Sequence, residues 1–371
     1  MSDSHRSIGI GIVGGGYMGK AHAVAFGAVG AVFDTALRPR LEMVCASTPA
    51  SAERYRSAFG FARATDNWRV LVNDPKVEAV VIASPQDTHR DIALAALALG
   101  KPVLCEKPLA ETPDLAREMV AAARDAGVAN MTGYNYIRTP ATQFARKLIA
   151  DGRIGQVTSF RGEMTEDFLS DPALPASWRT SGDANGCMGD LAPHPINCAQ
   201  ALMGPIASVF AHVETVHPTR GGVAVTNDDQ AYLTLRFASG GHGSIFTSRV
   251  ATGRKMGYAY DIYGTGGAIR FDGEDQNALW LYTTDVPEAE RGFRKILTGP
   301  AHPDYAAFCQ GPGHGTGYQD QIIIEAKDFL HAIATGAPVW PDFQEGLAVN
   351  QVVAASLASS RAKAWMDVAD F

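Results

Sequence analysis

The sequence predicts an α/β chain with a doubly wound parallel sheet near the N-terminus, followed by an α+β domain with a large, mostly antiparallel sheet. Up to about residue 135, short apolar runs alternate with amphipathic helical stretches, which is typical of parallel sheets buried on both faces. From about residue 155, longer runs alternate apolar and polar residues, which indicates half-buried strands. Since 371 residues exceed one usual hydrophobic core, we expect two domains, 1–135 and 136–371, with C-terminal helices able to pack back on the first.

The first domain is expected to follow a strand–helix order. Apolar runs predict strands at residues 8–13, 41–45, 79–83, 103–105 and 129–134. Helical spacing predicts helices at 92–99 and 114–126, the second opened by Thr112 as N-cap. A helix at 140–150 then leads into the second domain.

The second domain is expected to be an antiparallel meander with two C-terminal helices. Gly-rich or Asn/Asp-rich turns separate strands predicted at 157–163, 208–216, 231–237, 243–249, 258–263, 268–271 and 278–282. The helices are predicted at 321–335 and 346–363. One face of such a sheet packs on the core, and the other is available for a site or for an oligomer interface.

Composition excludes several classes of protein. The chain is 46% hydrophobic and 19% charged with a net charge of -7, which favours a globular protein and argues against nucleic-acid and membrane partners. Residues 1–6 show no signal-peptide pattern, and no apolar run reaches the length of a membrane span. The five cysteines lack metal-ligand spacing, so we expect no metal and reduced thiols in a cytoplasmic protein.

A glycine-rich turn follows the first predicted strand and opens a helix. It reads Gly14-Gly15-Gly16-Tyr17-Met18-Gly19. Gly14 permits the tight turn, Gly16 lets the backbone approach a pyrophosphate at the helix N-terminus, and Gly19 allows the helix to pack on the strand. This context predicts a Rossmann dinucleotide-binding domain whose loop, Tyr17 and Met18 included, contacts the cofactor.

The residues after the second strand bear on the choice of dinucleotide. A carboxylate usually binds the adenosine ribose at this point, but the chain has Ala46-Ser47-Thr48. No acidic side chain here would repel a 2′-phosphate, and the two hydroxyls could hydrogen-bond to it. An arginine that would pair with the phosphate does not follow directly, because the nearest are Arg40 and Arg54. We expect NAD, with NADP as an open alternative.

Two segments carry candidate catalytic groups. Lys107 follows the strand 103–105, at the edge of a parallel sheet where ligands bind. Asp190 and His194 are one helical turn apart, so they are expected to share a face, with His194 as general base and Asp190 orienting it. Taken alone, the Asp190–His194 spacing is more often a structural pair or a helix cap than a catalytic dyad, and the position of Lys107 does not exclude an ordinary surface lysine.

Several motifs together resemble the Gfo/Idh/MocA family, named after glucose-fructose oxidoreductase and inositol dehydrogenase. The resemblance covers nearly the whole chain. It rests on the glycine loop, Ser84-Pro85-Gln86-Asp87-Thr88-His89, Glu106-Lys107-Pro108, the segment 133–140, the segment 189–197 and the strand-turn 262–267.

The resemblance implies roles for individual residues. Lys107, Asp190 and His194 match the catalytic positions of the family, and Glu106 and Asn135 match positions near the nicotinamide ribose. The cofactor site would also include Ser84, Pro85, Gln86 and His89. The family often has Asp where this chain has Asn197, which changes one sugar contact.

The late loop, residues 291–318, resembles that of bacterial dehydrogenases of sugars, anhydrosugars and inositols. This implies oxidation of a ring hydroxyl of a sugar or cyclic polyol, by a homodimer or homotetramer. Candidate substrate residues are Tyr136, Arg138, Trp178, Arg179, Asn197, Arg249 and His314. Two alternatives stay open: an NAD-dependent glycosidase acting by transient oxidation and elimination, and a dinucleotide-binding regulator.

Overall fold

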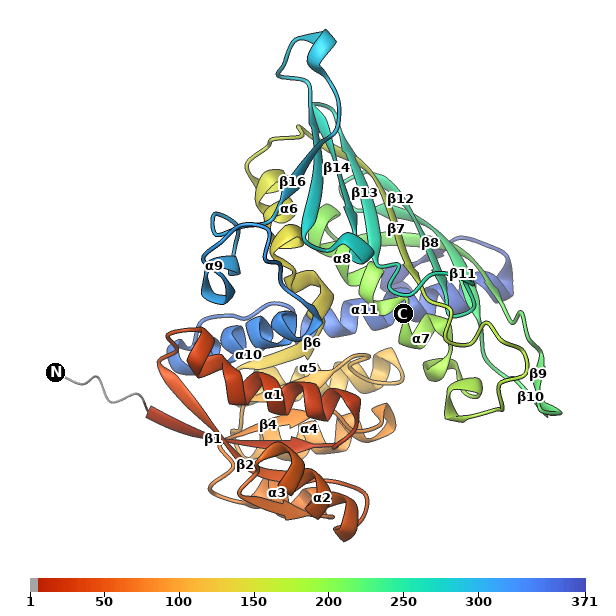
Figure 1. Ribbon diagram of the computed structural model, residues 1–371. Helices are drawn as coiled ribbons and strands as arrows, with labels where there is room; N and C mark the ends of the chain where they lie inside the picture. Colours follow the sequence, from red (N-terminus) through yellow and green to blue (C-terminus); the bar gives the residue numbers. More distant parts are fainter. Residues whose placement is uncertain (1–5) are drawn as a thin grey trace. The chain divides into compact units, whose positions relative to one another are not determined.

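The computed structural model describes residues 6–371, which form two compact units (Figure 1). The first unit comprises the chain up to Arg138 together with Gly317–Ala348. The second comprises Thr139–Thr316 and Val349–Phe371. The chain first passes from one unit to the other after Arg138, three residues beyond the expected boundary at 135. It returns to the first unit for residues 317–348. Residues 1–5, most of the segment without a signal-peptide pattern, lie outside the described residues.

The first unit contains a six-stranded parallel sheet with the order β3-β2-β1-β4-β5-β6. Its strands are β1 (Arg6–Val13), β2 (Leu37–Cys45), β3 (Arg63–Thr65), β4 (Ala79–Ile82), β5 (Val103–Glu106) and β6 (Asn130–Gly133). This confirms the doubly wound parallel sheet. The sequence does not predict β3, because three residues without an apolar run give no strand pattern. The strand order reverses between β1 and β4, where such sheets bind their ligands.

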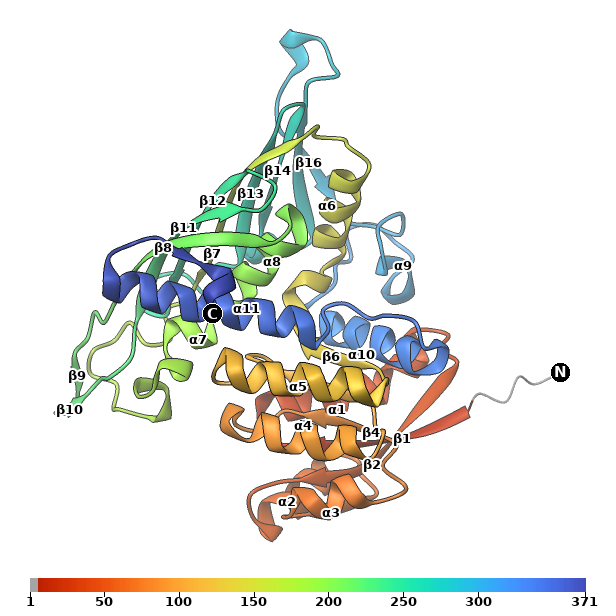
Figure 2. The same cartoon turned by 180° about the vertical axis from the view of Figure 1, so that it is seen from behind.

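Helices cover both faces of this sheet. They are α1 (Tyr17–Val32), α2 (Pro49–Phe59), α3 (Trp68–Asn73), α4 (His89–Ala98), α5 (Pro113–Ala126) and α10 (Tyr318–Thr335). Figures 1 and 2 show α1 beside α10 on one face and α4 beside α5 on the other. The Thr112 side chain accepts a hydrogen bond from the Leu115 backbone N–H (3.4 Å), which confirms the predicted N-cap of α5.

The second unit contains a nine-stranded mixed sheet with the order β16-β15-β14-β13-β7-β12-β11-β8-β17. Its strands are β7 (Val157–Thr165), β8 (Ile206–Glu214), β11 (Gln230–Phe237), β12 (His242–Ser248), β13 (Ala259–Gly264), β14 (Gly267–Asp272), β15 (Ala278–Thr283), β16 (Arg294–Leu297) and β17 (Met366–Asp367). The sheet is mostly antiparallel, as predicted, but it is not a simple meander. β7 lies between β13 and β12 and pairs with β12 in parallel. Residue pattern cannot reveal this, because it shows which face is buried and not which strands pair.

Five helices accompany this sheet in the second unit. They are α6 (Pro140–Ala150), α7 (Cys187–Asp190), α8 (Pro193–Met203), α9 (Tyr305–Phe308) and α11 (Phe343–Ala362) from Val349 onward. Along β11, Ala231, Leu233 and Leu235 are buried, and the intervening side chains are exposed. On the exposed face, Tyr232 stacks on Phe246 with ring centroids 4.5 Å apart. None of the helices within residues 6–371 combines the length and apolarity needed to cross a membrane.

Candidate active site

The glycine loop joins β1 to α1 and has the geometry of a pyrophosphate site. Gly14 has a φ of 102°, and a Cβ there would lie 2.3 Å from the Ala83 carbonyl oxygen. A Cβ on Gly19 would lie 1.9 Å from the Gly14 oxygen. Gly16 has open space around it and caps α1 without a side chain, so backbone N–H groups at the helix N-terminus can meet an anion. These residues fit the phosphates of a dinucleotide.

Tyr17 and Met18, between Gly16 and Gly19, both contact Tyr318 of α10. Tyr17 is 73% exposed, and its ring lies against Tyr318 with centroids 5.8 Å apart. The Met18 sulfur accepts a hydrogen bond from the Tyr318 hydroxyl (3.2 Å). α10 therefore supports the loop through Tyr318, a residue that the sequence analysis did not select.

The segment after β2 is divided between scaffold and open surface. Ala46 is nearly buried and Ser47 is exposed, but the Thr48 side chain caps α2 by accepting the Ser51 backbone N–H (3.1 Å). Arg40, a candidate for a 2′-phosphate, pairs with Glu42 (2.7 Å) and lies opposite Gly9, five residues before the end of β2. This arrangement directs Arg40 away from the strand end and favours NAD.

His89 connects the end of β4 to the turn after β5. The expected cofactor contact at His89 is not supported, because the ring is buried and both nitrogens face backbone oxygens, those of Pro108 (3.0 Å) and Ser84 (3.0 Å). Burial lowers the pKa of His89, so the ring is neutral. Pro85 and Gln86 lie at the start of the short helix η1 (Gln86–Thr88), and Ser84 precedes them, at the sheet edge where cofactor contacts remain a prediction.

The end of β5 carries the Glu106–Lys107 pair. Glu106 is almost fully buried, with Oε1 2.7 Å from His22 Nε2 and Oε2 3.3 Å from the Lys107 backbone nitrogen. The Lys107–Pro108 peptide bond is cis. Lys107 thus follows directly on a carboxylate that is held at both oxygens.

The segment after β6 forms the short helix η2 (Asn135–Arg138), which packs on α10. The buried Asn135 amide donates to Gln321 Oε1 (2.9 Å), and the Tyr136 ring lies 5.9 Å from that of Tyr318. Arg138 is buried and pairs with Asp328 and the Trp340 carbonyl oxygen (2.9 Å). The expected substrate contact of Arg138 is therefore not supported, because its guanidinium is committed to these partners.

In the second unit, Asp190 and His194 lie on two consecutive short helices. Asp190 ends α7, and His194 is the second residue of α8. α7 and α8 are separate helices, but Leu191 and Ala192 between them both keep right-handed helical dihedrals. That Asp190 and His194 share a face stays a prediction. Asn197 follows His194 by three residues on α8, and both are buried.

Arg179 is paired with Asp190. Its Nη1 lies 2.7 Å from Asp190 Oδ2. The guanidinium also lies over the Trp178 ring, 4.4 Å from the centroid, and 5.3 Å from that of Phe168. Trp178 is 63% exposed. Three candidate residues, one catalytic and two substrate-binding, therefore meet in one cluster with an open aromatic face.

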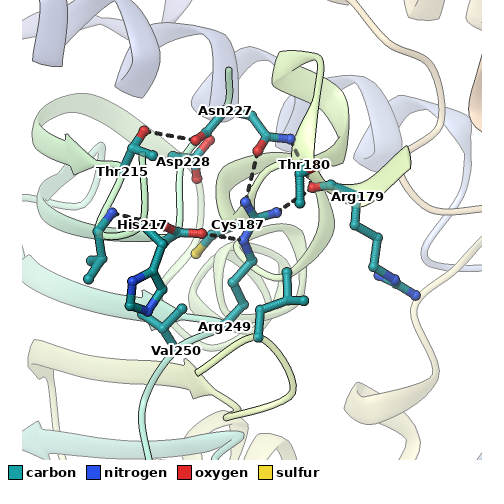
Figure 3. A network of polar contacts seen from close by, with 12 residues as sticks. Arg179, Thr180, Cys187, Thr215, His217, Asn227, Asp228, Arg249 and Val250 are labelled. Carbon is teal, nitrogen blue, oxygen red and sulfur yellow. Dashed lines mark hydrogen bonds and ion pairs between the residues drawn. The ribbon is translucent and has the colours of Figure 1, made fainter. Parts of the chain in front are cut away.

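A buried ion pair holds the loop that carries Arg179 (Figure 3). Arg249 Nε lies 2.9 Å from Asp229 Oδ1, and both side chains are almost fully inaccessible. Arg249 also donates to the carbonyl oxygens of Arg179 (2.6 Å) and Asn185 (3.1 Å) and to Asn227 Oδ1 (2.8 Å). The Arg179 side chain extends away from this network. Arg249 is therefore part of the scaffold, a correction to its expected role as substrate contact.

The residues preceding β11 complete this scaffold. Asn227 donates to the carbonyl oxygens of Arg179 (3.0 Å) and Gly182 (3.0 Å). Asp228 accepts the Met188 backbone N–H (2.6 Å) at the start of α7, and burial raises the pKa of Asp228 to about 6. Asp229 accepts the backbone N–H groups of residues 216 and 217 (2.8 and 2.9 Å). Three consecutive side chains thus fix three different segments.

His314 lies in an exposed loop and contacts Cys309, with Nδ1 2.7 Å from Sγ. Its substrate contact stays a prediction. All five cysteines are free thiols, and only Cys309 is not fully buried. Among residues 6–371, no group of three or more metal-ligating side chains could hold a metal ion.

The chain matches two family models. Residues 8–134 match an oxidoreductase family with an NAD-binding Rossmann fold, and residues 142–270 match the GFO/IDH/MocA C-terminal domain. Levoglucosan dehydrogenase from Pseudarthrobacter phenanthrenivorans is 37% identical, over 98% of each chain. The chain belongs to the Gfo/Idh/MocA family.

Other members of the Gfo/Idh/MocA family also match this chain over nearly its full length. Inositol 2-dehydrogenase from Rhizobium meliloti is 28% identical over 98% of this chain and 100% of its own. The solved structure of levoglucosan dehydrogenase in complex with NADH and levoglucosan superposes with a TM-score of 0.96 at 37% identity, covering 98% of this chain and 100% of that one. These findings confirm the predicted family, the NAD-binding domain and the oxidoreductase class.

The structure adds residues that the sequence analysis missed. In the first unit these are His22, Tyr318, Gln321 and Glu325, and in the second unit Asn227, Asp228 and Asp229. His22 follows Gly19 by three residues on an apolar helix, where an isolated histidine gives little signal. The run Asn227-Asp228-Asp229 resembles a polar turn before a strand, and its burial appears only in the structure.

Proposed function

We propose that this Gfo/Idh/MocA protein oxidises a secondary hydroxyl of a cyclic polyol or pyranose sugar to a ketone, with NAD as the hydride acceptor. The Asp190–Arg179 pair beside the exposed Trp178 carries the proposal. An aromatic face suits the C–H surface of a sugar ring, and charged neighbours suit its hydroxyls. The names of the relatives, which include levoglucosan and inositol dehydrogenases, support the same substrate class.

The proposed roles follow the chemistry of the side chains. His194 takes the hydroxyl proton as general base, and Asp190 supports the positive charge that His194 then acquires. The Lys107 ammonium hydrogen-bonds the substrate oxygen and stabilises developing negative charge. Bound NAD supplies the hydride acceptor, nicotinamide C4. Ketone reduction uses the same groups in reverse.

The decisive experiment is a substrate screen. Inositols, aldoses, anhydrosugars and glycosides are offered with NAD+ and with NADP+, and the absorbance of the reduced nicotinamide is followed. The proposal expects NAD+ reduction with at least one sugar or polyol, and loss of that activity in His194→Ala. A Thr112→Ala variant, altered at the N-cap of α5 and outside the proposed site, controls for lost stability. No turnover with any compound would contradict the proposal.

The same screen separates two other functions. Release of an aglycone from glycosides with only catalytic amounts of NAD+ would indicate a glycosidase that oxidises its substrate transiently. Dinucleotide binding without any turnover would indicate a regulator.

We also propose that copies of this chain associate through the exposed face of the nine-stranded sheet, as a homodimer or homotetramer. That face carries Tyr232, Phe246, Phe210 and Trp365, with the first two rings stacked and the last two 6.0 Å apart. Exposed aromatic groups of this kind mark protein interfaces. The interface is tested by measuring the molar mass of Tyr232→Asp by light scattering. We expect this variant to dissociate into smaller species than the wild type. A cytoplasmic location, supported by five free thiols, is part of the proposal.

A further inference from the structure

A cluster of buried ionisable groups lies under the sheet edge of the first unit. His22, on α1, is fully buried and bonds Glu106 at the end of β5 (2.7 Å). Glu325, on α10, is also fully buried, and neither of its carboxyl oxygens has a hydrogen-bond partner among residues 6–371. The Tyr134 backbone N–H lies close enough to Glu325 to lower the pKa of that carboxyl, although it donates its hydrogen bond to the Thr132 carbonyl oxygen (3.0 Å). An ionisable group left in this state is costly, so its retention calls for a functional reason.

The position of Glu106 connects this cluster to the cofactor. A doubly wound sheet consists of two mononucleotide-binding halves, and ligands bind at the carboxyl ends of its strands. The adenosine ribose belongs to the half with β1 to β3, so the nicotinamide belongs to the half with β4 to β6. Glu106 ends β5 and immediately precedes Lys107. His22 therefore joins the helix that receives the pyrophosphate to the strand end on the nicotinamide side.

We propose that His22 and Glu325 are positioning residues for the cofactor: His22 fixes the Glu106 carboxylate, and the proton on Glu325 sets the preference between NAD+ and NADH. The nicotinamide ring is positively charged in NAD+ and neutral in NADH. A further negative charge in this half of the site therefore stabilises NAD+ relative to NADH. Glu325 supplies that charge only when it loses its proton.

The neighbouring charges place this change near neutral pH. Burial raises the pKa of Glu325 to about 7. Arg138, His22 and the Tyr134 backbone N–H oppose that effect, and Glu106 adds to it. Burial disfavours a charged His22, but the hydrogen bond and charge of Glu106, with the charge of Glu325, raise the pKa of His22 overall. Two further charged residues lie on the same helix as Glu325. Asp328 forms ion pairs with both Arg138 and Lys327. Tyr134 and Tyr318 stay neutral because burial raises the pKa of both.

The test uses only the full-length protein and its cofactor. NADH affinity is measured by fluorescence titration from pH 6 to pH 8.5, and NAD+ affinity by displacement of NADH. In the wild type, the ratio of the NADH to the NAD+ dissociation constant is expected to rise about fivefold across this range, the order expected of one unit charge in a partly desolvated interior. In Glu325→Gln, which is isosteric and uncharged, the ratio should rise less than in the wild type, because only the charge of His22 can still change in this cluster. A wild-type ratio that stays constant overturns the proposal, whether or not the variant folds.

Variants of His22 test the positioning of Glu106. His22→Leu removes the contact and is expected to weaken binding of both cofactor forms about tenfold, whereas His22→Gln retains a donor and should recover most of the affinity. Val29→Ala, on the buried apolar side of the same helix, controls for lost packing and should bind like the wild type. Wild-type affinity in His22→Leu, or no recovery in His22→Gln, contradicts the proposal. Because no sugar is used, the outcome is independent of the proposed substrate class.

Discussion

Replacing Asp229 by Asn tests the buried ion pair that holds the Arg179 loop. The substitution keeps the shape of the side chain but leaves the Arg249 charge buried without its counter-ion. Removing one partner of a fully buried pair costs about 3–5 kcal/mol of the free energy of unfolding. For a unit of about 200 residues this corresponds to a melting temperature lower by roughly 10 °C.

The double variant Asp229→Asn/Arg249→Met separates stability from loop anchoring. It removes the stranded charge, so we expect it to recover much of the lost melting temperature. It cannot restore the hydrogen bonds to the Arg179 and Asn185 carbonyl oxygens. Amide hydrogen exchange in residues 178–186 should therefore be faster in both variants than in the wild type.

A partly exposed ion pair of the same unit serves as the control. Glu163 lies 2.7 Å from Arg254, with both side chains about one third exposed. Glu163→Gln should cost less than about 1 kcal/mol, because solvent screens the lost charge. The proposed role of the ion pair is refuted if Asp229→Asn melts within about 2 °C of Glu163→Gln, or if hydrogen exchange in the loop is unchanged.

Three further predictions concern single side chains. Glu325 holds its proton in the folded state up to a pKa of about 7, against 4.5 ordinarily, so the folded state binds more protons between these values and wild-type stability falls as pH rises. Relative to Glu325→Gln, chemical denaturation should show a loss of about 3 kcal/mol between pH 4.5 and pH 7. Gly14→Ala forces a side chain into positive φ and against the Ala83 carbonyl, so NADH titration should show affinity at least about tenfold weaker. Lys107→Ala and His194→Ala should each lower kcat about 100-fold or more, while NADH affinity in His194→Ala stays at the wild-type value.

The sequence was most informative where structure depends on local chemistry. The glycine loop, the Thr112 cap and the strand–helix order of the first unit all depend on residues close together in the chain, and the structure contains each of them. β3 was missed because three residues without an apolar run carry no periodicity.

Long-range contacts decided what the sequence could not show. Arg249 was expected at the substrate because a polyhydroxylated ring needs many hydrogen-bond donors, but Asp229, 20 residues away, makes its burial possible. Arg138 depends in the same way on Asp328. His22 and Glu325 lie more than 300 residues apart in the sequence, so no local pattern links them. The parallel pairing of β7 and β12 likewise depends on strands about 80 residues apart.

The division of the chain has a consequence for its synthesis on the ribosome. The first unit needs α10 and the second needs β17, and both elements come from the last 55 residues, Gly317–Phe371. Neither unit can therefore complete its packing while the C-terminal segment is still inside the ribosome. β7 also waits for β12 and β13 before it has a partner on either side. The nascent chain thus exposes apolar strands for longer than sequential domains would, and chaperone binding during translation is expected to favour this interval.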